Sequence, residues 1–161
     1  GKNGILDANN FIPYPKKFKE QDEIARKQEE KIDKEISKIN KMKISKAKKE
    51  KLVEEAWNKY PIIKDGYNSG GCEWCVKNWG SIWNFRYIHI EEREKGFIFL
   101  TFDSAWYPQK EVIKKMGEMF KKLDFDLRYF EGGCGFNGLL KIEKGEITME
   151  EEANYYGERG G

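Results

Sequence analysis

The stretch that most limits how this chain can fold runs from residue 18 to residue 58 and contains neither glycine nor proline. Between its lysines and glutamates, apolar residues recur at helical spacing, at Ile32, Ile36, Ile39 and Met42. Ser45 is a suitable cap for a second helix after a break near residues 43–44. We therefore predict a charged helical hairpin over residues 18–60, with one long helix as the alternative.

The part of the chain after residue 80 is rich in aromatic and β-branched residues and predicts alternating strands and turns. The predicted elements are strands at 81–90 and 97–102, a helix from Pro108 to about residue 122, and strands at 124–130, 138–143 and 146–149. This order predicts an α+β fold, namely a ferredoxin-like antiparallel sheet with helices on one face, plus the charged helical hairpin as an insertion.

Four regions follow from these elements. Residues 1–17 are expected to be extended, because Pro13 and Pro15 oppose regular structure there. Residues 18–60 form the helical hairpin, residues 61–150 the ferredoxin-like domain, and residues 151–161 a flexible tail.

Charge and cysteine content limit the expected binding partners and cellular compartment. The net charge is +2, but residues 1–60 carry +5 and residues 61–161 carry −3. A solvated helical face accounts for this asymmetry, and a basic arm that binds an acidic partner is the alternative. No apolar run approaches the ~18 residues needed to span a membrane, so no membrane contact is expected. Three cysteines, an odd number, favour reduced thiols in a cytoplasm over a disulfide framework.

Four segments are similar to motifs of a known family. Residues 11–16 resemble its I-I-P-x-P segment, residues 74–83 its W-C-x-x-N-W-G-T-K-W signature, residues 102–108 its F-x-T-A-W-S-P motif, and residues 129–138 its closing strand. This is the Api92-like family with a ferredoxin-like domain, found in phages, prophages and plasmids. The resemblance implies an accessory protein of a mobile genetic element in a bacterial cytoplasm, and it implies no catalytic activity. The family's usual first strand is absent here, and the charged segment 19–56 is longer than typical.

The tryptophans are the main candidates for a binding site. Trp79, Trp83 and Trp106 lie near predicted strand ends, where Arg86 and Tyr87 add polar contacts. Aromatic surfaces with a few polar groups are typical of sites for ligands and peptide anchors. The alternative is that these rings form the core of the domain.

Residues 95–102 (KGFIFLTF) resemble the RNA-binding strand pattern K/R-G-F/Y-G/A-F-V-x-F/Y. Strand alternation predicts Phe97 and Phe99 on one face, beside Lys95, and Ile98 on the other. Two aromatic rings on an open sheet face can stack on bases of single-stranded RNA. The same pattern also arises in any amphipathic strand that follows a glycine turn.

A zinc-stabilised module is a further alternative. Cys72 and Cys75 have the C-x₂-C spacing, and His89 and Cys134 would complete a tetrahedral set. The last two are isolated from each other in sequence, so ordinary reduced cysteines are the simpler interpretation.

The sequence therefore predicts a non-catalytic binding protein with no cofactor. A single histidine leaves no evident nucleophile–base pair. The expected partner is a protein or small ligand of unknown identity, contacted through aromatic strand ends or an open sheet face, and nucleic acid is kept as an alternative partner.

Overall fold

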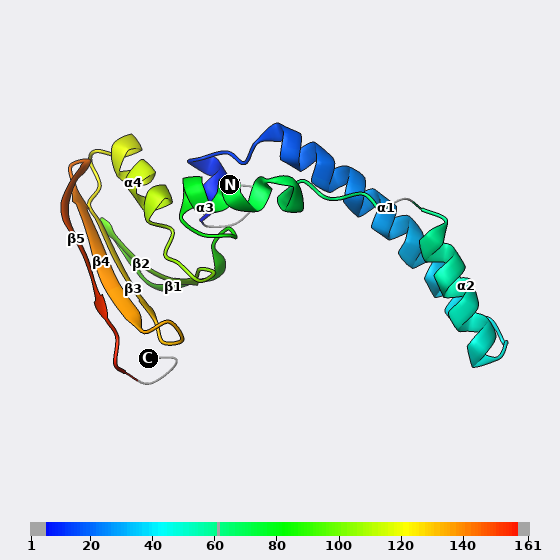
Figure 1. Cartoon of the computed structure of the whole chain (residues 1–161). Helices are drawn as coiled ribbons and strands as arrows, with labels where there is room; N and C mark the ends of the chain where they lie inside the picture. The colour runs from blue at the N-terminus through cyan, green and yellow to red at the C-terminus, as the bar shows by residue number, and fades with distance from the viewer. Residues whose placement is uncertain (1–5, 61, 158–161) are drawn as a thin grey trace. The chain divides into compact units, whose positions relative to one another are not determined.

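A computed structural model describes residues 6–60 and 62–157. Within them the helices are α1 (Lys16–Asn40), α2 (Lys46–Asn58), α3 (Gly71–Trp79) and α4 (Lys110–Met119). The strands are β1 (Arg86–Glu94), β2 (Phe97–Asp103), β3 (Phe125–Glu131), β4 (Phe136–Glu143) and β5 (Glu146–Asn154) (Figure 1). Two short 3₁₀ turns lie at Ala8–Asn10 and Tyr67–Ser69.

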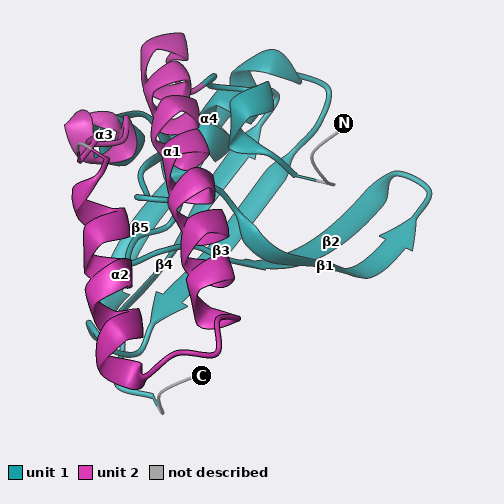
Figure 2. Ribbon diagram, turned by 90° about the vertical axis from the view of Figure 1, so that its right-hand side faces the viewer, with its two compact units in different colours: residues 1–13, 72–161 teal, residues 14–71 magenta. Residues whose placement is uncertain are grey.

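The chain divides into two compact units (Figure 2). Unit 1 comprises residues 1–13 and 72–161, and unit 2 comprises residues 14–71. Unit 2 thus interrupts unit 1 in sequence, which agrees with the predicted insertion of a helical hairpin into an α+β domain.

Unit 2 is the predicted hairpin of two helices, α1 and α2. One buried residue recurs every seven positions along α1, at Phe18, Ala25, Ile32 and Ile39. A heptad spacing keeps one narrow seam of α1 facing its partner helix. On α2, Ala56 is buried, and Lys59, just beyond α2, is ion-paired with Glu35 of α1. The expected break falls at residues 41–45, so the alternative of one long helix is wrong.

The segment after α2 returns along α1 and is tied to its first turns. The Gln21 side-chain amide donates to Lys64 O at 2.7 Å and to Ser69 Oγ at 2.9 Å. Asp22 accepts a hydrogen bond from the backbone N–H of Tyr67 at 2.9 Å. These bonds hold the base of the hairpin closed, while its other end is the α1–α2 loop.

Unit 1 contains two antiparallel sheets, with β1–β2 in one and β3–β4–β5 in the other. Helix α4 contacts all three strands of the second sheet and covers one face of it. Leu127, Leu140 and Ile142 are buried in that sheet. Gly117 of α4 permits the close approach, because a Cβ there would lie 2.6 Å from Ile142 Cγ2. The predicted α+β class with a helix on one sheet face is confirmed.

Ion pairs join α4 to β5 at the edge of this sheet. Lys114 Nζ lies 3.1 Å from Glu150, and Lys110 Nζ lies 3.2 Å from the same carboxylate. Hydrogen bonds from Lys114 and Lys110 lower the pKa of Glu150. Burial opposes the charge of Lys114, but its hydrogen bonds to Glu150 and Glu111 outweigh that effect and raise its pKa.

Several predicted boundaries were wrong. β1 begins at Arg86 and not at residue 81, because residues 81–85 leave the ladder to make buried contacts. α3 occupies Gly71–Trp79, where no helix was predicted. Residues 151–154, expected to be a flexible tail, pair with β4, because backbone hydrogen bonds hold an acidic strand without apolar alternation. In the segment 1–17, residues 1–5 lie outside the described residues, Ala8–Asn10 form a 3₁₀ turn, and α1 already begins at Lys16.

Candidate aromatic binding surface

Two segments that flank the β1–β2 ladder are joined by buried hydrogen bonds. Ser81 is fully buried, and its hydroxyl donates to Ala105 O at 3.0 Å and accepts from Ala105 N–H at 3.2 Å. Gln109 is also fully buried, and its side-chain amide donates to Trp83 O at 2.5 Å. These bonds bring the Trp79–Trp83 motif and the Phe102–Pro108 motif side by side.

Gly80 is required at this junction for two reasons. Its φ of 84° lies in the left-handed region that side chains disfavour. A Cβ at this position would lie 2.9 Å from Pro108 O, too close for an ordinary contact. The Gly80-Ser81 pair therefore serves to dock two chain segments against each other.

Asn84 anchors the N-terminal part of unit 1 at the same place. Its side-chain oxygen accepts from the backbone N–H groups of Ala8 and Phe85, each at 2.9 Å. Its amide donates to the buried carboxylate of Asp7 at 2.7 Å. Phe85 packs edge-on against Phe102, with ring centroids 4.8 Å apart. The backbone from which the neighbouring aromatic side chains project is thus held by several independent contacts.

Outside this buried frame, five side chains make up what we call the aromatic surface: Trp83, Arg86, Tyr87, Trp106 and Tyr107. Tyr87, Trp106 and Tyr107 are 71%, 62% and 60% exposed. The Arg86 guanidinium lies 4.1 Å from the centroid of the Trp83 ring, in cation–π contact. Tryptophan, tyrosine and arginine are the residues enriched among energetic hot spots of protein interfaces.

Backbone strain coincides with this exposure. Only three non-glycine residues of the described chain have positive φ, and two of them are Tyr87 (48°) and Trp106 (65°). A left-handed conformation costs an L-residue roughly 1–2 kcal/mol. Residues held in such conformations tend to gather at sites of function, where the surrounding structure enforces them. Both lie near the end of the β1–β2 ladder where Arg86 pairs with Asp103, since Tyr87 directly follows Arg86 and Trp106 lies three residues after Asp103.

The strain at Trp106 leads to a prediction. We expect Trp106→Gly to be more stable than Trp106→Ala by about 1 kcal/mol, because glycine adopts positive φ without a Cβ clash. Urea unfolding of the two variants measures the difference. The control is the neighbouring Ala105, which has no positive φ. There the Ala105→Gly variant should be less stable than wild type, the reverse of the order at position 106. Equal stability of the two Trp106 variants would show that the position carries no strain.

Trp79 does not belong to the aromatic surface. It is only 5% exposed, and its indole N–H donates to Ile12 O at 2.8 Å. Its ring packs edge-on against Trp74, with centroids 5.6 Å apart. The prediction that Trp79 contacts a ligand is therefore wrong, and the alternative reading of this tryptophan as a core residue holds.

The strand that resembles an RNA-binding sequence is exposed, but negatively charged side chains lie beside its phenylalanines. Phe97 and Phe99 are both exposed on β2, as an RNA-stacking face requires. In the ladder Phe97 pairs with Glu94 and Phe99 with Glu92, and paired residues share a sheet face. Carboxylates beside both rings would repel phosphates, and Lys95 lies in the turn between the strands.

The four candidate zinc ligands do not lie together at one site. Cys72 and Cys75 lie on α3, His89 on β1, and Cys134 is exposed between β3 and β4. Across residues 6–60 and 62–157 no group of three or more potential ligands is placed to hold a metal ion. The spacing of Cys72 and Cys75 reflects one turn of helix, with Cys75 buried as a core thiol.

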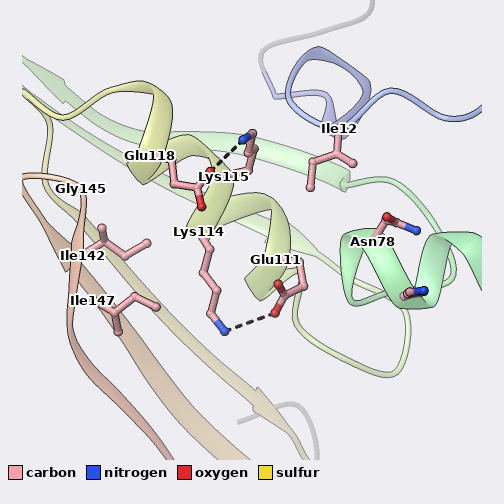
Figure 3. Close-up of a pocket in the computed structure, with 10 residues that line it drawn as sticks. Ile12, Asn78, Glu111, Lys114, Lys115, Glu118, Ile142, Gly145 and Ile147 are labelled. Atoms are coloured by element: carbon pink, nitrogen blue, oxygen red, sulfur yellow. Dashed lines mark hydrogen bonds and ion pairs between the residues drawn. The ribbon is translucent and has the colours of Figure 1, made fainter.

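A separate cavity of about 410 Å³ lies in unit 1 (Figure 3). Its lining comes from α4, the β4–β5 turn, α3 and Ile12. Lys114 and Lys115 are among the lining residues, and each is ion-paired with a glutamate of the same helix, Glu111 or Glu118. Since these charges already neutralise each other, the cavity offers less for recognition than the aromatic surface does.

The described residues of unit 1 thus combine an antiparallel α+β fold with an exposed aromatic surface. Residues 82–158 match the family model described as "Ferredoxin-like domain in Api92-like protein". This match confirms the resemblance to the Api92-like family for residues 82–158. No curated protein and no solved structure matches the chain. None of the helices in the described residues is long and apolar enough to cross a membrane.

Sequence reasoning named Trp83, Arg86, Tyr87 and Trp106 as site residues, and the structure places all four at one end of β1–β2. It missed Tyr107, which is exposed and stacks on Phe136 at 6.3 Å between ring centroids. The signal was present, since Tyr107 lies inside the Phe102–Pro108 motif, directly after Trp106.

Proposed function

We propose that this chain is a non-catalytic accessory module that binds a protein partner through the aromatic surface. The observation that carries the proposal is the exposure of Tyr87, Trp106 and Tyr107, with two of the three held in strained backbone conformations. An exposed aromatic group of this kind is characteristic of protein interaction sites.

A protein partner suits the surface better than a small ligand or RNA. Ligand sites are concave and bury most of their occupant, whereas these side chains project into solvent. RNA recognition by β2 is opposed by Glu92 and Glu94 beside the exposed phenylalanines. The same two carboxylates would favour a partner with basic groups near its apolar contact residues.

The groups with chemical reactivity support a binding role over catalysis. Ser81 uses its hydroxyl in two buried backbone hydrogen bonds. His89, the single histidine, pairs across the ladder with Thr101, whose hydroxyl instead donates to Glu91 at 2.6 Å. A nucleophile needs a neighbouring base, and neither hydroxyl is directed to the imidazole.

We further propose that the module acts in the cytoplasm of a bacterial host as part of a phage or plasmid. The support is the resemblance of this chain to the Api92-like family, which implies such a setting. Cys72 and Cys134 are free thiols, which suits a reducing compartment.

The test is affinity capture followed by measurement with a purified partner. Tagged protein retains proteins from a bacterial extract, and mass spectrometry compares wild type with Trp106→Ala. Proteins lost in the variant are purified, and titration calorimetry then measures their affinity. We expect Trp106→Ala to weaken binding by about 30-fold, since truncation of a hot-spot tryptophan costs about 2 kcal/mol or more.

Trp57→Ala is the matched control, because Trp57 is also about half exposed but lies on α2. It should retain the same proteins with unchanged affinity. Loss of the same proteins from both variants would contradict the proposal. So would capture that disappears on ribonuclease treatment and in the Phe97→Ala/Phe99→Ala variant, because RNA would then be the ligand.

A further inference from the structure

The positive charge of unit 2 is concentrated at one end of the hairpin. Residues 16–37 hold seven basic and seven acidic residues, so most of α1 is neutral overall. Residues 38–51, which we call the lysine tip, hold seven lysines and one glutamate, a net charge of +6. A solvated helix needs no such separation of charge, as the rest of α1 demonstrates.

The contacts of the lysines follow the same division. In the first half of α1, Arg26 is ion-paired with Glu23 and Glu30, and Lys27 also reaches Glu23. At the lysine tip the single acidic residue, Glu50, lies 3.9 Å from Lys46. Lys49 donates to the backbone oxygen of Asn40 at 2.7 Å. The other tip lysines are exposed: Lys38, Lys41, Lys43, Lys48 and Lys51.

The geometry of unit 2 presents these charges together. α1 and α2 run antiparallel, so the loop of residues 41–45 lies at the end of the hairpin opposite its base (Figure 2). α1 has 25 residues, and at 1.5 Å per residue it is about 37 Å long. Lysines from the end of α1, the loop and the first two turns of α2 therefore form one cationic surface.

The side-chain types at the tip indicate the ligand. It has lysines but no arginine and no aromatic residue. Proteins that bind single strands stack bases on aromatic rings, which this surface does not offer. Interfaces with proteins have an apolar centre, whereas Met42 is the one large apolar side chain that residues 38–51 expose. Lysines as point charges suit phosphates of a duplex, which need no base recognition.

We propose that the lysine tip binds the phosphate backbone of double-stranded nucleic acid without sequence preference. This surface is separate from the aromatic surface, and the proposal does not depend on a protein partner there. A duplex carries one negative charge per ~1.7 Å of its axis, so a compact group of lysines can contact several phosphates. Binding of this kind releases counterions and weakens steeply with salt.

The test measures fluorescence anisotropy of a labelled DNA duplex of arbitrary sequence, with the full chain, over a series of salt concentrations. If three phosphates are contacted, raising salt from about 50 to about 200 mM should weaken binding by about 40-fold. The triple variant Lys41→Gln/Lys43→Gln/Lys48→Gln should bind at least about tenfold more weakly. Its salt slope should fall by about one unit for each phosphate contact removed.

Lys19→Gln/Lys31→Gln/Lys34→Gln is the matched control, because it removes the same charge from exposed positions in the neutral part of α1. Its affinity and salt slope should equal those of wild type. Circular dichroism checks that both variants keep their helix content. Equal losses in the two variants, or no duplex binding by wild type, would overturn the proposal. Binding of polyglutamate at salt where the duplex is not bound would do the same, because an acidic protein would then be the partner.

Discussion

Replacing Trp79 with alanine is expected to lower the free energy of unfolding by about 3–5 kcal/mol, enough to unfold a marginal domain. The ring is buried, packs against Trp74 and donates to Ile12 O. Its removal leaves a cavity and an unpaired backbone oxygen at the contact between residues 6–13 and α3. Urea unfolding, followed by circular dichroism, measures the change.

Trp106→Ala provides the comparison for this prediction. Trp106 is mostly exposed, and surface substitutions usually change stability by no more than about 0.5 kcal/mol. The two tryptophans therefore separate stability from binding: Trp79→Ala should unfold the domain, and Trp106→Ala should leave it folded. A Trp79→Ala variant as stable as Trp106→Ala would show that residues 6–13 do not pack on α3 as described.

Two adjacent leucines of β4 give the second large effect. Leu140 is fully buried on the sheet face that α4 covers, whereas Leu139 lies on the opposite face and is only partly buried. Leu140→Ala should destabilise the protein by about 2–5 kcal/mol, because deletion of a buried leucine also leaves a cavity. Leu139→Ala makes the same chemical change one residue away and should cost much less.

Thermal or urea unfolding of both leucine variants tests the register of the sheet. A shift of β4 by one residue would move Leu139 to the α4 side and reverse the order of the two effects. Leu139→Ala as the more damaging change would therefore contradict the pairing of Leu140 with Leu127 and Glu150.

The helices of unit 2 could be predicted because their signal is local. The helical spacing of apolar residues and the absence of glycine and proline between residues 18 and 58 indicate the helices, and the break near Ile44 was visible as well. The strand at residues 150–154 could not be predicted, because three consecutive glutamates, Glu150 to Glu152, show no alternation of apolar and polar residues. Glu150 is stabilised on the α4 side by Lys110 and Lys114, from a distant part of the sequence.

For the candidate site, sequence showed which residues are present but not which face they occupy. Trp79 and Trp83 looked equivalent, yet Trp79 lies at the end of α3 and is buried, whereas Trp83 follows the Gly80-Ser81 junction and is exposed. That difference depends on the bonds of Ser81 to Ala105 and of Gln109 to Trp83, which span more than twenty residues. The strain at Trp106 depends on the same tertiary contacts.

The two ends of unit 2 meet. Tyr14 packs so closely on Gly71 that a side chain there would collide with the tyrosine ring. The chain therefore enters and leaves unit 2 within the span of one tyrosine side chain, so its 58 residues link residue 13 to residue 72 across a short distance. Evolution or design could add the same number of heptads to both helices, or remove them, and the hydrogen bond between Asp7 and Asn84 would not need to change. The length of the hairpin that carries the lysine tip can therefore change while unit 1 stays the same.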